Sequence, residues 1–368
     1  MKQIAVFFGG ESVEHDVSII TGITTLNALD NDRYEAIPVY VSKDGIFYTG
    51  KSLKDIDSFR KTEVKKLDKV AFLPGSNVMY KIKGKKLIAI ANVFAVVNCM
   101  HGGVGEDGSF AGLMNLCKIP LSAPNVLPSS VSMDKAFTKN VLKSLNVKHL
   151  PAFKIKSVYD FHKLDENSIV YPLIIKPNLL GSSIGITKAQ NREQVVPAIL
   201  NALKFCDSAI IEPCLEDFME INCAAYRKYN GEVILSECER PIGKGEILDF
   251  SDKYRDGDRE FPARISKSIA EKIKKATLKV YEACDFTGIV RMDFMVKGKD
   301  VYLNEINSVP GSLSYYLFCD TLKEFSEILS EIIEKAVKDH AKAKTTVKKF
   351  DSGILGGVGT KGTKHLKN

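Results

Sequence analysis

The chain has 368 residues, of which 45% are hydrophobic, and this is enough for two or three domains that each bury a core. Its N-terminal apolar run is short, and no later run approaches the length of a membrane-spanning helix. We therefore expect a cytoplasmic protein that does not insert into a membrane. Eight cysteines without a CxxC pair favour reduced thiols over a disulfide framework or a zinc site.

The formal net charge of +7 does not indicate a nucleic-acid-binding surface. Residues 335–368 contain nine lysines and two aspartates, which account for the whole excess and leave the rest of the chain close to neutral. We therefore expect no nucleic-acid partner. Residues 344–368 are predicted to form a basic tail rich in glycine and lysine, whose GGVGTKG lacks the spacing of a phosphate-binding loop.

The first part of the chain, over residues 1–123, predicts a small α/β domain with an open sheet. A strand at IAVFF is followed by a tight GGES turn, a helix from about Glu14, and strands near 36–41 and 93–98. Between about 43 and 90 we expect a more irregular, lysine-rich excursion. GGES does not have the spacing of a dinucleotide-binding fingerprint, so NAD is not inferred.

Two further compact units are predicted, over residues 124–212 and 213–343. The proline- and serine-rich PLSAPNVLPSS has the composition of a linker and sets the first boundary. Ser132 is expected to cap a helix that starts at Met133. The other expected elements are the strand YPLIIKP, the loop GSSIG, a strand ending in IIEP, a strand from Met219, a helix over about 263–284, a hairpin, and a last helix over about 321–341.

The hairpin predicted from VRMDFMV, KGKD and VYLNEIN carries Asp293, Glu305 and Asn307. Alternation places Arg291 and Asp293 on one face of the first strand, and Leu303, Glu305 and Asn307 together on the second. An odd-length turn would set Asp293 opposite Glu305. Two carboxylates and an amide oxygen are the sparse oxygen set that Mg²⁺ accepts, because it sheds its waters reluctantly. The alternative is a pair of strand-edge acids balanced by Arg291 and nearby lysines.

Lys176 ends the strand LIIKP, and the loop GSSIG follows five residues on, so a cation, backbone N–H groups and two hydroxyls converge. This combination suits nucleotide phosphates, although a plain hairpin turn has the same composition. Lys135 is a second candidate for phosphate contact, or an ordinary surface lysine. Glu212 is a candidate acceptor for an adenine amino group, and Glu220 for ribose hydroxyls, unless both are solvated acids.

Taken together, these residues resemble the ATP-grasp fold and, within it, the D-alanine:D-alanine ligase family. The resemblance covers about residues 3–340. It implies a three-domain ATP-grasp architecture of mixed α/β class, in which two domains clasp ATP beside the N-terminal domain. The resemblance rests on five blocks in order: GGESVEHDVS at 9–18, HGGVGEDGSFAG at 101–112, SMDK at 132–135, IIKPNLLGSSIG at 174–185, and VRMDF with NEINSVPG at 290–294 and 304–311.

The resemblance also implies roles for individual residues. Glu14 would receive the ammonium group of the first substrate, in a hydrogen-bonded trio with Ser182 and Tyr254, and His101 would lie near that substrate. Two Mg²⁺ ions, or Mn²⁺ in their place, would bind the phosphates of ATP. The implied metal ligands are Asp293, Glu305 and Asn307, and the implied ATP-binding residues are Lys135, Lys176, Glu212, Leu215, Glu220 and Lys253.

The reaction that the resemblance implies joins two D-alanines for peptidoglycan precursor synthesis, in a homodimeric enzyme. ATP converts the first carboxylate to an acyl phosphate, and the amine of the second D-alanine attacks it. Arg291 and the backbone N–H of Gly311 would stabilise the tetrahedral oxyanion. The GSSIG loop and residues 240–254 are the expected lids that exclude water.

One departure from the family pattern leaves the second substrate open. Tyr316 stands where a family serine binds the second carboxylate, so its hydroxyl or that of Ser314 would take over, or the pocket accepts a different amino acid or small amine. Pro213 also replaces the family's lysine after the adenine-facing glutamate. A nucleotide-sensing protein without catalysis is a more distant alternative, which the complete set of metal and oxyanion residues argues against.

Overall fold

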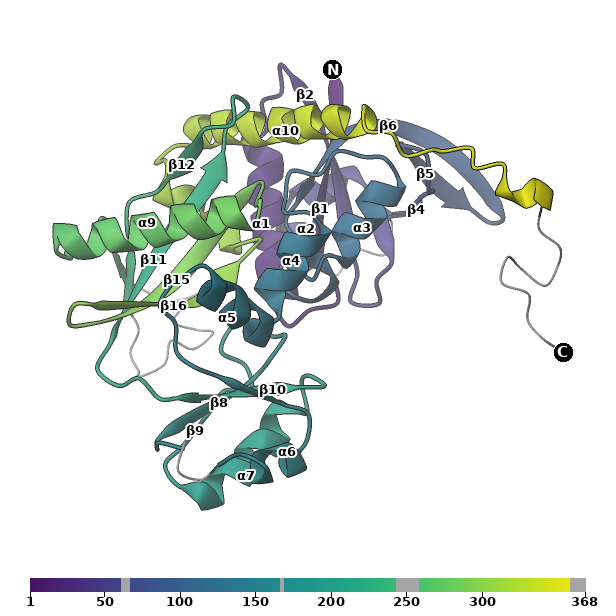
Figure 1. Cartoon of the computed structure of the whole chain (residues 1–368). Helices are drawn as coiled ribbons and strands as arrows, with labels where there is room; N and C mark the ends of the chain where they lie inside the picture. The colour runs from purple at the N-terminus through teal and green to yellow at the C-terminus, as the bar shows by residue number, and fades with distance from the viewer. Residues whose placement is uncertain (61–66, 166–168, 243–257, 358–368) are drawn as a thin grey trace, which may run out of the picture.

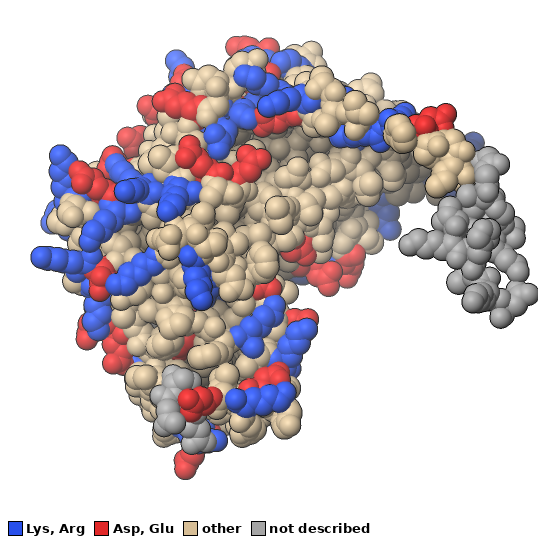
Figure 2. Space-filling model, viewed as in Figure 1, with Lys and Arg blue, Asp and Glu red and all other residues tan. Residues whose placement is uncertain are grey.

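The computed structural model describes residues 1–60, 67–165, 169–242 and 258–357. In these ranges the strands form a six-stranded ring, two four-stranded sheets and a two-stranded ribbon, with helices packed against them (Figure 1). The predicted mixed α/β class is confirmed. On the face shown in Figure 2, Lys and Arg side chains are interspersed with Asp and Glu. None of the helices in the described ranges has both the length and the apolar character needed to cross a membrane.

The N-terminal ring has six strands: β1 (Lys2–Gly9), β2 (Tyr34–Val41), β3 (Phe47–Thr49), β4 (Asp68–Phe72), β5 (Val78–Lys83) and β6 (Lys86–Asn98). The expected open sheet is wrong, because β6 closes the ring. Its 13 residues pair antiparallel with β5 in the first half and parallel with β1 in the second. The stretch expected to be irregular thus contains β3, β4, β5 and the start of β6, and its lysines within the described residues lie at partly or fully exposed positions.

Two helices from opposite ends of the chain pack on this ring: α1 (His15–Ala28) and α10 (Leu322–Lys344). Helix α1 lies against β1, and α10 runs across the top of the domain in Figure 1. Phe8 of β1 and Leu329 of α10 belong to one hydrophobic core. At its edge, Lys2 Nζ donates to Glu334 Oε1 at 2.7 Å. The last long helix therefore completes the first domain.

Short helical elements lie in the N-terminal part of the chain and link it to the central domain: η1 (Lys51–Lys54), α2 (Asp57–Arg60), η3 (Gly103–Gly105), α3 (Ser109–Leu116), α4 (Val126–Met133) and α5 (Lys135–Ser144). The expected cap of α5 is wrong, because Asp134 and not Ser132 accepts from the Phe137 N–H, at 2.9 Å. Ser132 lies in α4, where its hydroxyl donates to the Pro128 carbonyl. Part of the expected linker is helical because Pro128 stands in the first turn, where no N–H is needed.

The central domain is a four-stranded sheet in the order β7-β10-β8-β9, covered by two helices: β7 (Phe153–Ile155), α6 (Val158–His162), β8 (Leu173–Pro177), β9 (Thr187–Ala189), α7 (Arg192–Ala202) and β10 (Ala209–Pro213). Ile175 and Ile211 pack in the core under the helices. Their strand neighbours Lys176 and Glu212 alternate to the opposite face. That face turns toward the C-terminal domain.

The C-terminal domain is built on a sheet in the order β12-β11-β15-β16, with a separate ribbon β13-β14. Helix α9 packs against this sheet, and its buried residues share a core with the inward side chains of β11, β15 and β16. The elements are β11 (Met219–Arg227), β12 (Val233–Leu235), β13 (Arg240–Ile242), β14 (Asp258–Glu260), α9 (Lys267–Ala283), β15 (Ile289–Lys297), β16 (Asp300–Asn307), η5 (Gly311–Leu317) and, near the C-terminus, η6 (Ile354–Gly357).

A β-bulge sets the register of the β15–β16 hairpin. Lys297 pairs with Asp300 across a two-residue turn, and this even length alone would not place Asp293 opposite Glu305. The register shifts after Asp293, so that Asp293 pairs with Glu305 through the bulge and not through an odd-length turn. The bulge also places Leu303 and Glu305 on opposite faces of the sheet. Leu303 pairs with Phe294 in the core, so its predicted place beside Glu305 is wrong.

Gly22, inside α1, packs directly against the Phe8 side chain of β1. A Cβ at Gly22 would lie 2.3 Å from Phe8 Cγ. Gly22→Ala is therefore expected to lower the free energy of unfolding by about 1–3 kcal/mol, measured by urea denaturation. Gly112→Ala in α3 is the matched control, because its Cβ would meet only Val126 Cγ2, at 3.9 Å. Equal destabilisation by the two changes would contradict the packing argument.

Candidate active site

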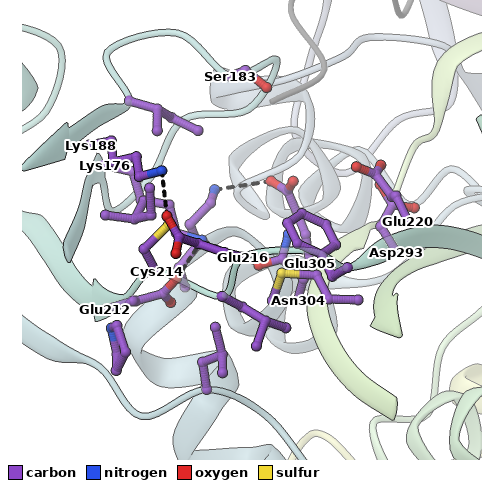
Figure 3. Close-up of a pocket in the computed structure, with 18 of the residues that line it drawn as sticks. Lys176, Ser183, Lys188, Glu212, Cys214, Glu216, Glu220, Asp293, Asn304 and Glu305 are labelled. Carbon is purple, nitrogen blue, oxygen red and sulfur yellow. Dashed lines mark hydrogen bonds and ion pairs between the residues drawn. The ribbon is translucent and has the colours of Figure 1, made fainter. Parts of the chain in front are cut away.

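A cleft of about 600 Å³ lies between the central and the C-terminal sheets. Strands β8 and β10 form one wall, strands β11, β15 and β16 form the other, and polar side chains from both walls converge in Figure 3. The cleft brings together candidates that lie far apart in the sequence. From the predicted nucleotide and metal residues, it is lined by Lys135, Lys176, Glu212, Leu215, Glu220, Asp293 and Glu305.

Glu212 occupies the centre of a buried charge cluster and is only 3% exposed. Its carboxylate oxygens lie 2.7 Å from Lys139 Nζ and 2.9 Å from Lys176 Nζ. Burial alone would raise the pKa of Glu212, but the Lys176 and Lys139 ammonium groups outweigh it and hold that pKa below its usual range. Sequence analysis missed Lys139. Its signal was the spacing of four residues from Lys135, which puts both lysines on one face of α5.

The predicted metal ligands meet cationic side chains. Arg291 Nε and Nη2 donate to the two carboxylate oxygens of Asp293 at 2.8 and 2.9 Å, and Asn307 Nδ2 donates to Asp293 Oδ2 at 3.0 Å. Glu305 Oε1 lies 3.0 Å from Lys135 Nζ. Two carboxylates and an amide on adjacent strands form a hard-oxygen set that fits Mg²⁺, once Asn307 presents its oxygen in place of its nitrogen.

Asn304 is a second cleft residue that sequence analysis missed. As the extra residue of the bulge it lines the cleft together with Glu305, and its Oδ1 accepts from Lys176 Nζ at 3.3 Å. In a regular strand, consecutive residues point to opposite faces. The adjacent polar pair Asn304 and Glu305 was therefore the available signal for a bulge.

Glu14 connects the N-terminal domain to the GSSIG loop. It precedes α1, is 8% exposed, and accepts a short hydrogen bond from Ser182 Oγ through Oε1. Lys135 Nζ donates to the Leu180 carbonyl at 2.6 Å, just before the loop. A Cβ at Gly181 would lie 3.4 Å from Glu14 Oε2, so the loop backbone passes close to the carboxylate. The predicted Glu14–Ser182 pair is thus brought together.

His101 is part of a hydrogen-bond chain that fixes the turn after the hairpin. Its Nδ1 donates to the Val309 carbonyl at 2.6 Å, so Nε2 accepts from Thr21 Oγ1 at 2.7 Å. Thr21 Oγ1 in turn accepts from the Ser312 N–H at 2.9 Å. Burial lowers the pKa of His101 to about 4, which agrees with a neutral ring. Both ring nitrogens are therefore used to position the backbone beyond Asn307.

That turn, η5, begins at Gly311 and is conformationally costly. Ser312, Leu313 and Ser314 have φ values of 52°, 48° and 48°, in the left-handed region that L-residues avoid at about 1–2 kcal/mol each. Ser314 is fully buried, and its hydroxyl has no hydrogen-bond partner among the described residues. Tyr316 follows in the same turn and lies beside Arg291. Burial raises the pKa of Tyr316, while Arg291 and its hydrogen bond to the phenol act to lower it.

Two family models match most of the chain. The model described as D-ala D-ala ligase N-terminus matches residues 3–124, and the one described as D-ala D-ala ligase C-terminus matches residues 146–338. The chain belongs to the D-alanine–D-alanine ligase family. A D-alanine–D-alanine ligase of Thermosipho melanesiensis is 34% identical over 366 residues, which cover 96% of this chain and 98% of that protein.

Solved structures of ligases in this family share the fold. The D-alanine–D-alanine ligase of Helicobacter pylori superposes with a TM-score of 0.75 at 29% identity, over 90% of this chain and 98% of that one. The VanG D-Ala:D-Ser ligase of Enterococcus faecalis gives 0.78 at 25% identity, over 91% and 99%. The predicted ATP-grasp fold of a D-alanine–D-alanine ligase is therefore confirmed.

Some of the predicted residues of the ligase site lie outside the described ranges. These are Lys253, Tyr254 and the part of the expected lid from 243 onward. Within the family block HGGVGEDGSFAG, sequence analysis missed Glu106, which accepts from the Gly102 and Val309 N–H groups, both at 2.7 Å. Burial and the nearby Glu14 carboxylate raise the pKa of Glu106 to about 7.

The neutral His101 is expected to make the ligase fold sensitive to acid. Its pKa is about 4 in the folded protein and about 6.5 in an unfolded chain, so the unfolded state binds more protons between these values. The free energy of unfolding should therefore fall by about 2 kcal/mol from about pH 7 to about pH 5, relative to a His101→Gln variant. Urea denaturation of both proteins measures the difference, and parallel pH profiles would disprove the argument.

Proposed function

We propose that this protein joins two D-alanines to D-alanyl-D-alanine through an acyl phosphate, with conversion of ATP to ADP and phosphate. The observation that carries the proposal is the position of Lys135. This buried ammonium group contacts the carbonyl of Leu180 beside the Glu14–Ser182 pair, and it also contacts Glu305 of the metal-ligand hairpin. First-substrate, phosphate and metal candidates therefore meet at one point, as phosphoryl transfer to a carboxylate requires.

The proposed place of this reaction is the cytoplasm, where its dipeptide product would supply peptidoglycan synthesis. The homodimer that the family resemblance implies stays a prediction. Sedimentation of the purified protein tests it directly.

We assign one end of the cleft to the nucleotide. Glu212 is kept in this assignment, but its ion pairs with Lys139 and Lys176 support a role in fixing those lysines more than in accepting the adenine amino group. The contact of Lys253 with the γ-phosphate rests on the family resemblance alone. The proposed ATP-binding residues are Lys135, Lys176, Glu212, Leu215, Glu220 and Lys253.

Asp293, Glu305 and Asn307 would hold Mg²⁺, two ions in all, or Mn²⁺. When bound, the metal neutralises the charge that moves with the transferring phosphoryl group. Arg291 keeps the Asp293 carboxylate in a fixed orientation through two hydrogen bonds. Lys135 does the same for Glu305. The protein thus prepares the ligand oxygens before a cation arrives.

A smaller cavity that adjoins the cleft, with Glu14 in its lining and with Lys135 and Glu305 lining both, is assigned to the amino acids. Glu14, oriented by Ser182 and by Tyr254 from the resemblance, would bind the ammonium group of the first D-alanine, whose carboxylate attacks the γ-phosphorus. The amine of the second substrate, after losing a proton, attacks the acyl carbon, and the bond from that carbon to the phosphate oxygen breaks. Arg291 and the Gly311 N–H would stabilise the oxyanion in between.

A second candidate function keeps this mechanism but changes the acceptor. Tyr316 fills the position of the family's serine, and one structural neighbour is a D-Ala:D-Ser ligase. Phosphate release from ATP and Mg²⁺ with a panel of D- and L-amino acids, together with identification of the product, tests both candidates. Formation of D-alanyl-D-alanine supports the first. Activity only with a different pair overturns it in favour of the second.

Asp293→Asn is expected to reduce ligation at least about 100-fold, because the variant loses a charged ligand and leaves Arg291 without its carboxylate partner. Phosphate release over a range of Mg²⁺ concentrations measures the effect. The control is Asp300→Asn, which removes the charge of an exposed acid that pairs with Lys148 at the start of β16, the other strand of the hairpin. Comparable losses in the two variants would argue against a metal role for Asp293.

Glu14→Gln is expected to raise the KM for the first D-alanine at least about 10-fold while the KM for ATP changes little. The reason is that the lost charge pairs with an ammonium group and not with phosphate. Initial rates at varied D-alanine and varied ATP separate the two constants. An equal rise in both would remove Glu14 from the first-substrate site.

A further inference from the structure

Arg259 is an exposed arginine whose guanidinium makes four contacts with neighbouring residues. It lies on β14, and its side chain is 40% exposed. Its guanidinium carbon lies 4.9 Å from the centre of the Tyr316 ring and 5.3 Å from that of Phe261. Its Nη1 donates to the Tyr316 carbonyl at 3.3 Å and lies 3.4 Å from Glu239 Oε1. Four contacts thus fix the plane of a side chain that is usually mobile at a surface.

These contacts use only one part of the guanidinium. Both hydrogen-bonding contacts involve Nη1, and no described residue accepts from Nε or Nη2. The edge formed by Nε and Nη2 is the fork that binds the two oxygens of a carboxylate in parallel. Glu239 does not fill that role, because it is buried, lies at the long distance of 3.4 Å, and shares its carboxylate with Asn222 Nδ2.

The position of Arg259 connects it to the reacting centre through Tyr316. The Tyr316 ring lies under Arg259, and its phenol hydrogen-bonds to Arg291, which in turn holds Asp293. Lys135 and Glu305 lie on the phosphate side of that centre, and the residues that line the 600 Å³ cleft do not include Arg259 or Tyr316. Arg259 therefore stands beside the reacting centre but away from the nucleotide.

We propose that Arg259 is the receptor for the α-carboxylate of the second substrate, with Tyr316 as its platform. This inference rests on the proposed ligase function and refines it: the acceptor is selected as an amino acid, through its carboxylate, over a simple amine. The guanidinium takes over carboxylate binding at the place where the family has a serine hydroxyl. Tyr316 then acts as a positioning residue, because it orients Arg259 by stacking.

Competition between two acceptors tests the proposal in one reaction. Hydroxylamine attacks the same acyl phosphate as the second D-alanine but carries no carboxylate, and it gives D-alanyl hydroxamate. In Arg259→Met, which keeps the length and loses the charge, the ratio of hydroxamate to dipeptide at fixed concentrations should rise about 10- to 100-fold. Hydroxamate formation itself should change less than about 3-fold, which also shows that the variant is folded. Arg259→Lys keeps the charge but lacks the two-pronged guanidinium, so its ratio of hydroxamate to dipeptide should lie between those of the wild-type protein and Arg259→Met.

Arg264→Met is the matched control. Arg264 follows on the same segment, is 90% exposed and pairs with Glu260, so its loss should leave the product ratio unchanged. If the ratio of hydroxamate to dipeptide is unchanged in Arg259→Met, the proposal is overturned, but the ligase function is not. This holds whether both products fall together or neither falls. If the wild-type protein forms neither product, the ligase function itself fails, and the inference fails with it.

Discussion

The bulge at Asn304 shifts the register of the β15–β16 hairpin by one residue, and this shift places Glu305 on the same face as Asp293. In a regular hairpin with the same turn, Glu305 would face Met292 and enter the apolar core, where an unpaired carboxylate is costly. Instead it meets Lys135 of the central domain at 3.0 Å. The bulge therefore creates the acidic pair and also links the two sheets that enclose the cleft.

The buried charges of the cleft are balanced before any substrate arrives. Asp293 pairs with Arg291, Glu305 pairs with Lys135, and Glu212 lies between two lysines. Such pairs contribute little net stability, because desolvation offsets most of their attraction. Their value is geometric: phosphates and a metal ion exchange partners with side chains that are already oriented, so little reorganisation accompanies binding.

Local patterns were enough to predict much of the fold and several parts of the site. The helix from Glu14, the hairpin strands and the last helix follow from apolar periodicity, and the order of the motif blocks indicated the family. Local patterns did not predict contacts between residues that lie far apart along the chain. No pattern in β6 shows that its two halves pair with different strands, and none shows that His101 meets Thr21 and Val309. The bulge and Lys139 each have a weak sequence signal: the adjacent polar pair Asn304 and Glu305, and the four-residue spacing from Lys135. Neither signal could be interpreted without knowing how the domains pack.

Helix α10 places side chains near the C-terminus in the same core as the first strand. A nascent chain exposes β1 and α1 long before Leu329 and its neighbours are synthesised, and until then this apolar surface stays uncovered. The N-terminal domain therefore reaches its full stability only after nearly the whole chain has left the ribosome. The first domain thus depends on a segment that is synthesised after the other domains. Docking of the last helix is the final step in the folding of the first domain.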